Sequence, residues 1–258
     1  MRMWNRHPGF QPHHRADGRL LILLLLALVM LGSLCTAQAE EPLRGVYNPD
    51  VPPPLAPEHE PTGDDYFSDA VFVGDSMMEY VELLGEIPTA DYVWKIGMGP
   101  GSVGMKQFRV RGEEENLSAY EMIARCNPRK IFIMLGANGL DYYPSDHVIA
   151  DYEVMADQLI TLCPDAMIYV ISAPPGSGEM MAQLDITPGR YKDFAVKLQA
   201  LAERRGFYFL DLYSLLVDEN GALPQEYDSG DGFHMSTKAY QLMIDMVRKH
   251  TVPYPEVQ

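Results

Sequence analysis

Four side chains of this sequence have the chemistry to cleave an ester through a serine nucleophile, and the first of them is Ser76. It follows the apolar run Val71-Phe72-Val73 and opens a segment with helical character. A serine at a strand-to-helix turn projects its hydroxyl out of the sheet, and the N–H groups at the helix start carry positive partial charge. This position suits a nucleophile whose reaction produces an oxyanion. Taken alone, however, Gly74-Asp75-Ser76 is more typical of a turn with a serine N-cap.

A base for Ser76 is offered by His234. The other histidines beyond residue 39 are His59 in a proline-rich stretch, His147 on a predicted exposed helix, and His250 near the end of the chain. Asp231 precedes His234 by three residues and can accept from one ring nitrogen, which fixes the tautomer and stabilises the imidazolium. Asp228 is a weaker candidate for that role. Taken alone, Asp231 and His234 are also typical of a polar turn that caps the last helix.

Donors for an oxyanion are available after two other apolar runs. Gly97-Met98-Gly99-Pro100-Gly101 is a glycine-rich loop whose backbone can approach a ligand and present N–H groups. Leu135-Gly136-Ala137-Asn138 follows the next run and carries a side-chain amide that can donate to a developing oxyanion.

The elements that must position these residues alternate between strands and helices. The strands are predicted at 70–74, 92–96, 130–135, 166–172 and 207–212. The helices are predicted at 77–84, 118–124, 148–162, 191–204 and 236–250, with Ser236 as the N-cap of the last. Continuously apolar strands are typical of a parallel sheet covered on both faces. The pattern predicts a three-layer α/β/α sandwich with a central, mainly parallel five-stranded sheet, whose sites lie at the carboxyl ends of the strands.

With these blocks in this order, the sequence resembles the SGNH hydrolase superfamily, the GDSL-type esterases and lipases, over about 65–250. The resemblance implies the flavodoxin-like SGNH fold and a carboxylic ester hydrolase that needs neither metal nor cofactor. It implies that Ser76 is the nucleophile, His234 the general base and Asp231 the residue that orients it. The oxyanion hole is then formed by the N–H of Ser76, the amide of Asn138 and the N–H of a loop glycine, with Gly97 as first choice and Gly99 as second.

The sequence departs from the family pattern after Asn138. Many members carry an aspartate next, whereas this chain has Gly139, and its first acid there is Asp141. We expect a looser loop around Asn138, with every group that the mechanism needs still present.

The amino-terminal residues predict export. Residues 1–19 contain four arginines, 20–34 are almost wholly apolar, and Ala37-Gln38-Ala39 offers the small residues that precede signal cleavage. We expect a signal peptide at 1–39, or an uncleaved anchor that tethers the protein to a membrane through residues 20–37. The prolines of 40–63 predict an extended linker, and the SGNH hydrolase domain is then 64–258. The predicted location is extracytoplasmic, either secreted or at the membrane.

The net charge of the chain limits which binding partners are expected. The formal charge is −16, and loss of residues 1–39 would make it more negative, so nucleic acid is excluded as an expected partner. The expected partner is a small-molecule or glycan ester. The sequence leaves the oligomeric state open, and it leaves Cys126 and Cys163 either as a disulfide or as two free thiols.

The predicted function is therefore an exported esterase of small acyl or O-acetyl esters that works through an acyl-serine intermediate. Two alternatives stay open: an O-acyltransferase that uses the same site on cell-envelope glycans, and a non-catalytic surface-binding domain. The loops 101–117, 141–147 and 174–188 contain apolar side chains that suit either a substrate pocket or ordinary packing: Met105, Phe108, Tyr142, Tyr143, Met180 and Met181.

Overall fold

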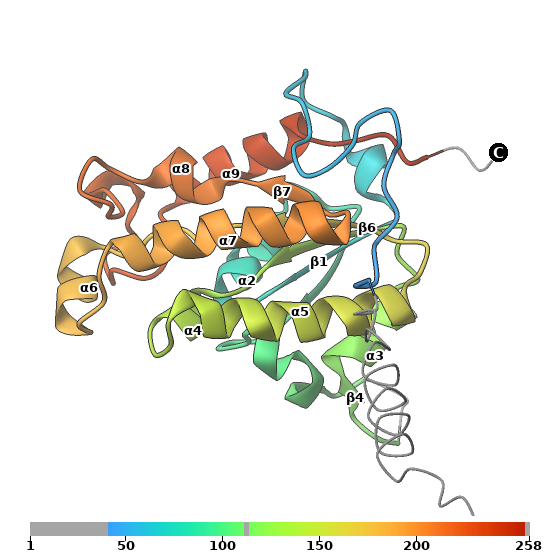
Figure 1. The fold of residues 1–258 in the computed structure, drawn as a ribbon, viewed down its shortest axis with the longest axis horizontal. Coiled ribbons are helices and arrows are strands. Elements are labelled where there is room, and N and C mark those ends of the chain that lie inside the picture. Colours follow the sequence, from blue (N-terminus) through green and yellow to red (C-terminus); the bar gives the residue numbers. More distant parts are fainter. Residues whose placement is uncertain (1–40, 111–113, 256–258) are drawn as a thin grey trace, which may run out of the picture. The chain divides into compact units, whose positions relative to one another are not determined.

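A computed structural model describes residues 41–110 and 114–255 of the chain, and the predicted signal peptide lies outside these ranges. Residues 42–258 form one compact unit. Its centre is a parallel five-stranded sheet in the order β2-β1-β5-β6-β7 (Figure 1). The strands are β1 (Ala70–Gly74), β2 (Asp91–Trp94), β5 (Lys130–Met134), β6 (Met167–Ile171) and β7 (Tyr208–Leu210). The predicted fold class is confirmed, and each strand lies within two residues of its predicted limits.

The longer helices also agree with the sequence pattern. They are α2 (Ser76–Leu84), α3 (Ala119–Arg125), α5 (Ser145–Leu162), α7 (Gly189–Arg205) and α9 (Thr237–Lys249). Shorter elements were not predicted: the helices α4 (Ala137–Leu140), α6 (Gly178–Gln183) and α8 (Leu212–Leu216), the 3-10 turns η1 (Asp64–Phe67), η2 (Pro100–Met105) and η3 (Gln225–Tyr227), and a hairpin of β3 (Gln107–Phe108) and β4 (Leu117–Ser118). Ser236 stands at the N-cap of α9, but its hydroxyl donates to Glu226 O instead of capping the helix.

The sheet separates two cores of different character. On one face, aliphatic residues such as Val71, Ile131 and Val170 pack against α3, α5 and α7. The other face packs against α2, α8 and α9 and carries a row of aromatic rings. The row crosses all five strands through paired positions and consists of Tyr92, Phe72, Phe132, Tyr169 and Tyr208. Neighbouring rings stack with centroids 4.4–5.5 Å apart.

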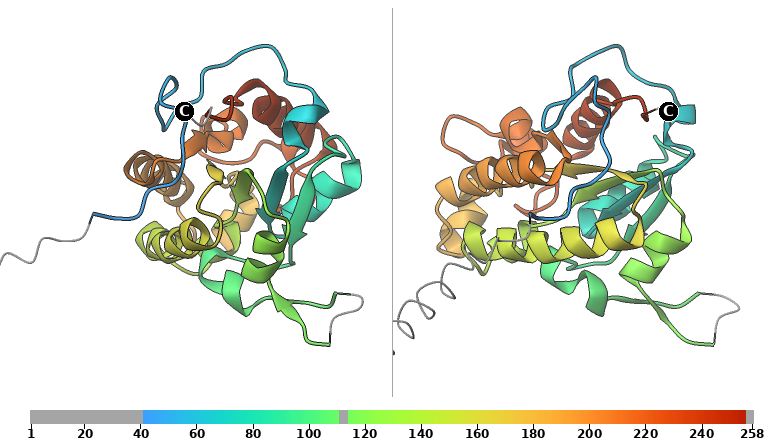
Figure 2. Two further views of the ribbon diagram at one scale, coloured as in Figure 1. Left: turned by 90° about the vertical axis from the view of Figure 1, so that its right-hand side faces the viewer. Right: turned by 45° about the vertical axis from the view of Figure 1, so that its right-hand side comes forward.

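The prediction of a linker over 40–63 is corrected by the structure, because residues 42–63 pack along the sheet and α9. Val46 and Leu55 form isolated parallel bridges to β6 and to Phe209. The N–H of Phe209 donates to Pro54 O at 2.7 Å, and the N–H of His59 donates to Lys249 O at 3.0 Å. Proline lacks an N–H but keeps its carbonyl, so a proline-rich segment can still cover the open edge of β7. The folded unit thus begins near Pro42, and the segment runs over it in Figure 2.

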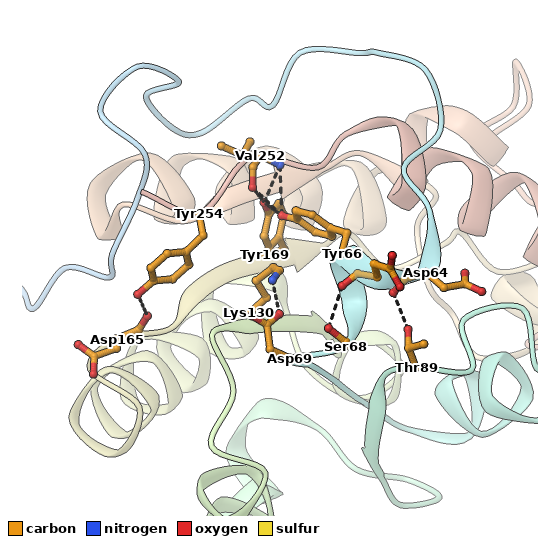
Figure 3. Close-up of polar contacts among 11 residues, drawn as sticks. Asp64, Tyr66, Ser68, Asp69, Thr89, Lys130, Asp165, Tyr169, Val252 and Tyr254 are labelled. Atoms are coloured by element: carbon orange, nitrogen blue, oxygen red, sulfur yellow. Dashed lines mark hydrogen bonds and ion pairs between the residues drawn. The ribbon is translucent and has the colours of Figure 1, made fainter. Parts of the chain in front are cut away.

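Residues of η1 and of the segment that follows α9 meet at the amino-terminal edge of the sheet (Figure 3). The Tyr66 hydroxyl donates to Val252 O at 2.7 Å, and the N–H of Val252 donates to the Tyr169 hydroxyl at 3.0 Å. The Tyr254 hydroxyl donates to Asp165 O at 2.7 Å, and Lys130 pairs with Asp69 at the start of the central strands. Residues of η1 and the segment after α9 therefore cover the amino-terminal edge of the sheet, and the candidate site lies at its carboxyl edge.

Candidate active site

The candidate nucleophile stands where β1 passes into α2. Asp75 is the N-cap of α2, and its Oδ1 accepts from Met77 N at 2.9 Å. Ser76 is therefore the first residue of the helix, with its N–H at the positive end of the helix dipole. No acceptor for this N–H is found among the described residues, so it is available to a substrate oxygen.

A chain of two hydrogen bonds connects Ser76, His234 and Asp231. Ser76 Oγ lies 2.9 Å from His234 Nε2, and His234 Nδ1 lies 2.6 Å from Asp231 Oδ2. Because a carboxylate only accepts, the proton belongs on Nδ1, which leaves Nε2 free to accept from the serine. Asp231 is held in turn by the N–H groups of Phe233 and His234, which donate to its Oδ1 at 2.9 and 2.8 Å.

Asn138 lies on the other side of the nucleophile, on α4. Gly136 starts this turn with φ of 128°, and a Cβ there would lie 2.6 Å from the Phe194 ring, so only glycine fits. The Asn138 amide donates to Asp75 Oδ2 at 2.6 Å, while its contact with Met98 O measures 3.4 Å. One N–H is thus fixed by Asp75, and the weakly held second one can serve a substrate oxyanion.

The glycine loop distinguishes between the two candidate glycines. Gly97 lies in a turn closed by Met98 N donating to Lys95 O at 2.9 Å, with φ of 67°. No acceptor for the Gly97 N–H is found within the described part of the chain. The Gly99 N–H already donates to Ser102 Oγ at 3.0 Å. The free donor favours Gly97 over Gly99.

The two aspartates of the site have opposite pKa shifts. Burial raises the pKa of Asp75 to about 6, although the hydrogen bonds from Met77 and Asn138 favour its ionised form. Partial desolvation acts in the same direction on Asp231, but the hydrogen bonds from the His234 and Phe233 N–H groups and from the His234 ring outweigh it. They lower the pKa of Asp231 to about 2. Asp231 is therefore a carboxylate at neutral pH.

The sequence around these residues matches a known protein family. Residues 63–242 match the family described as GDSL-like Lipase/Acylhydrolase. The chain belongs to this family. It is thus a GDSL-type carboxylic ester hydrolase, and the predicted family and enzyme class are confirmed.

Solved structures with a similar fold include two proteins from Bacteroides. A protein from Bacteroides fragilis, provisionally assigned as an acylhydrolase, shares 18% identity over 72% of this chain and 88% of its own, with a TM-score of 0.57. A GDSL-like lipase from Bacteroides thetaiotaomicron shares 16% identity over 71% of this chain and 87% of its own, also with a TM-score of 0.57. At these identities the likeness concerns the fold. A comparison with curated proteins gave no match.

Two hollows lie at the candidate site of this GDSL hydrolase, and Ser76 lines the first of them. The first, of about 500 Å³, is lined on the His234 side by Ser76, Tyr80, Asp228, Ser229, Asp231, His234, Met235, Ser236, Thr237 and Tyr240. The second, of about 380 Å³, is lined on the Asn138 side by residues 97 and 99–102, Met105, Asn138, Gly139, Tyr143, His147, Val148 and Asp151. Of the apolar loop residues left open above, Met105 and Tyr143 line the second hollow, whereas Met180 and Met181 are buried.

The loop around Asn138 is held despite the departure at Gly139. The Tyr191 hydroxyl donates to Asp141 Oδ1 at 3.2 Å, and Arg190 donates to Leu140 O at 2.8 Å. Asp141 therefore anchors the end of α4 to α7.

Cys126 and Cys163 are free thiols and form no disulfide, which is the second of the two alternatives that the sequence left open.

Sequence reasoning missed the part that Asp75 plays for Asn138. An aspartate directly before a helix is an N-cap signature, so its bond to Met77 N was readable from the sequence. Its second oxygen reaches Asn138, and that contact depends on β1 and β5 being neighbours.

The described residues hold no group of three or more His, Cys, Asp or Glu side chains arranged for a metal ion, and none of their helices is long and apolar enough to span a membrane.

Proposed function

We propose that this GDSL hydrolase is an exported serine esterase that removes short acyl groups, acetyl above all, from carbohydrate esters. The observation that carries the proposal is the hydrogen-bonded chain Ser76-His234-Asp231 beside unoccupied N–H donors. Ser76 Oγ attacks the ester carbonyl while His234 Nε2 takes its proton. The carbonyl oxygen becomes an oxyanion and accepts from the N–H groups of Ser76 and Gly97 and from the Asn138 amide.

The second half of the reaction uses the same groups in reverse. Protonated His234 gives its proton to the departing alkoxide, which leaves the acyl group on Ser76. Water then attacks the acyl-serine carbonyl while His234 takes one of its protons. His234 passes this proton to Ser76 Oγ as the acyl–oxygen bond breaks, which releases the acid and restores the serine. Asp231 remains ionised throughout and stabilises the imidazolium.

The preference for a short acyl group is supported by the hollow beside Asn138. It contains His147 and Asp151 as well as Met105 and Tyr143. His147 Nε2 and Asp151 Oδ2 lie 3.9 Å apart and are both partly hydrated, and a long alkyl chain in this space would remove that hydration without replacing it, which costs free energy. An acetyl group reaches the oxyanion donors without extending that far.

Export is supported by the sequence pattern of residues 1–39 alone: arginines, an apolar run and small residues before position 40. Amino-terminal sequencing of the protein recovered outside the cytoplasm tests it, with Glu40 as the expected first residue. Recovery with residues 1–39 intact in the membrane would indicate the uncleaved anchor instead, and recovery from the cytoplasm would refute export.

The esterase activity is tested with p-nitrophenyl acetate, butyrate and octanoate, each assayed with the purified protein and with Ser76→Ala. We expect kcat/KM to fall from acetate to octanoate and the activity to disappear in the variant. A rise with chain length would overturn the short-acyl preference, and equal activity in Ser76→Ala would overturn the serine mechanism.

A further inference from the structure

The hollow on the His234 side of Ser76 has features that the reaction at Ser76 leaves unexplained. In that reaction, which rests on the function proposed above, the leaving alcohol receives its proton from His234 Nε2. The alcohol must therefore depart on the His234 side. The hollow of about 500 Å³ is lined by both Ser76 and His234, whereas the hollow beside Asn138 is lined by neither. The alcohol part of the substrate consequently belongs in the first hollow, whose volume is typical of small-molecule sites.

Asp228 is held in this hollow with half of its carboxylate unused. Its Oδ1 accepts from Gly230 N at 2.8 Å and from Gly232 N at 3.0 Å. No partner for Oδ2 is found among the described residues, and Asp231, not Asp228, accepts from the His234 ring. Asp228 also lines two further hollows, both of which include Ser177 and Glu179. A carboxylate oxygen fixed in place beside the nucleophile can accept from a substrate hydroxyl.

A second, independent feature of the same hollow is the hydroxyl of Tyr240. Tyr240 is fully buried, stacks on the half-exposed Tyr80 at 4.6 Å, and lines the hollow with Ser76 and His234. Within the described part of the chain its hydroxyl has no hydrogen-bond partner. A buried polar group without a partner costs stability, so its retention beside the nucleophile indicates that it is used when substrate is bound.

The carboxylates around the hollow are not balanced by basic side chains. The residues that line this hollow and the two further hollows beside Asp228 include Asp228, Asp231 and Glu179. No lysine or arginine is among them. The nearby Lys238 is paired with Glu226. Apart from His234, which is protonated only during the reaction, the ionisable side chains here are acidic, and a negatively charged alcohol would be repelled by them, which disfavours its binding.

We propose that the alcohol part of the substrate is a polyhydroxy compound without negative charge, such as a neutral sugar, and that the free oxygen of Asp228 selects it by accepting a hydroxyl hydrogen bond. Tyr80 supplies a partly exposed aromatic ring at the mouth of the hollow, and its hydroxyl pairs with Thr237 at 3.2 Å. Asp228 is thus a specificity-determining residue rather than a member of the catalytic chain.

The test compares two monoacetyl esters that differ in one charge: an acetylated methyl glucoside and the matching acetylated methyl glucuronide, whose sugar carries a carboxylate. We expect the protein to prefer the glucoside at least tenfold in kcat/KM and Asp228→Asn to reduce this preference to threefold or less. A matched control is Asp218→Asn. Asp218 also accepts from two loop N–H groups, those of Asn220 and Ala222, but lies away from Ser76. It should keep the full preference.

The outcomes separate this proposal from the proposed function. Absence of Ser76-dependent hydrolysis on either ester and on p-nitrophenyl acetate would refute the esterase itself. Hydrolysis without a preference for the neutral sugar, or a preference that survives Asp228→Asn, would overturn the role of Asp228. If Asp228→Asn does not fold, Tyr240→Phe replaces it, because loss of an unpartnered hydroxyl leaves the fold intact. A fall of about fivefold in kcat/KM for the acetylated glucoside, at an unchanged or raised Tm, supports the proposal, and an unchanged kcat/KM overturns it.

Discussion

Asp75 and Asp231 support the two halves of the active site, and they do so in opposite surroundings. Asp75 is 2% exposed and holds the Asn138 amide, whereas the Asp231 side chain is 50% exposed and holds the His234 ring. Burial raises the pKa of Asp75 to about 6, while hydrogen bonds lower the pKa of Asp231 to about 2. The comparison shows that the support of the Asn138 amide is built into the core at a cost in stability, and that the support of the His234 ring is built on a loop at the surface.

The largest expected effect is the loss of kcat when Asp231, which holds the His234 ring, is replaced. Asp231→Asn should lower kcat about 10⁴-fold, because an amide can hold the imidazole in the wrong tautomer and does not stabilise the imidazolium. The measurement is kcat for p-nitrophenyl acetate, with Asp218→Asn as the control that stays within twofold of the wild type. A loss below tenfold would mean that another group orients His234.

The next effect concerns the Asn138 half. Asn138→Ala should lower kcat about 10²- to 10³-fold with little change in KM, because the amide serves the oxyanion rather than the bound ester. The exposed Asn220→Ala provides the control. An increase in KM at constant kcat would show that Asn138 binds the ground state and is not an oxyanion donor.

The pH dependence of stability sharpens the comparison between the two acids. The pKa of Asp75 is higher in the folded than in the unfolded chain, so the folded state binds the proton more tightly and stability falls as the pH rises through about 4 to 6. Relative to Asp75→Asn, the wild type should lose about 2 kcal/mol of unfolding free energy between pH 4.5 and 7.5. Denaturant unfolding at both pH values measures this, and parallel changes in the two proteins would contradict it.

Asp231 should show the reverse sign over a lower range. Its folded pKa lies below the unfolded value, so the stability it contributes is present above about pH 4 and is lost as the pH falls toward 2. Because the side chain is half exposed, solvent screening reduces the effect. Asp231→Asn should therefore match the pH profile of the wild type above pH 5 and differ from it only below pH 4.

The smallest expected effect concerns the anchor of α4. Tyr191→Phe removes the hydrogen bond to Asp141 and leaves Arg190 on Leu140 O. A hydrogen bond to a carboxylate contributes about 1.5 to 3 kcal/mol to stability, but Arg190 still holds Leu140 O, so kcat should fall no more than about fivefold. Phenylalanine at the exposed Tyr142 should change nothing. A loss beyond tenfold would mean that Asp141 controls the position of Asn138 more directly than one contact implies.

The sequence predicted the strands and the long helices because their apolar patterns are strong and local. Ser76, Asn138, Asp231 and His234 were chosen on equally local signals, because each follows a strand or precedes a helix, and the structure brings Ser76, His234 and Asp231 into one chain of hydrogen bonds. The roles of Asp75 and Asp228 were out of reach, since they depend on which strands are neighbours and which carboxylate reaches the imidazole. Residues 42–63 were misread for a physical reason: their prolines exclude helix but leave carbonyls that can pair with the edge of a sheet.

The row of stacked rings on the α2 and α9 face has a consequence for how accurately the site is assembled. Side chains alternate between the faces of a sheet, so a strand that paired one residue out of step would move its ring to the opposite face and break the row. The same slip would shift Ser76 against Asn138 by about 3.3 Å along the strand direction. The register that lets Phe72 stack on Phe132 is therefore the register that brings the oxyanion donors to the nucleophile. Near-ultraviolet circular dichroism of these coupled rings would report, without any substrate, the fraction of molecules in which the catalytic edge is correctly aligned.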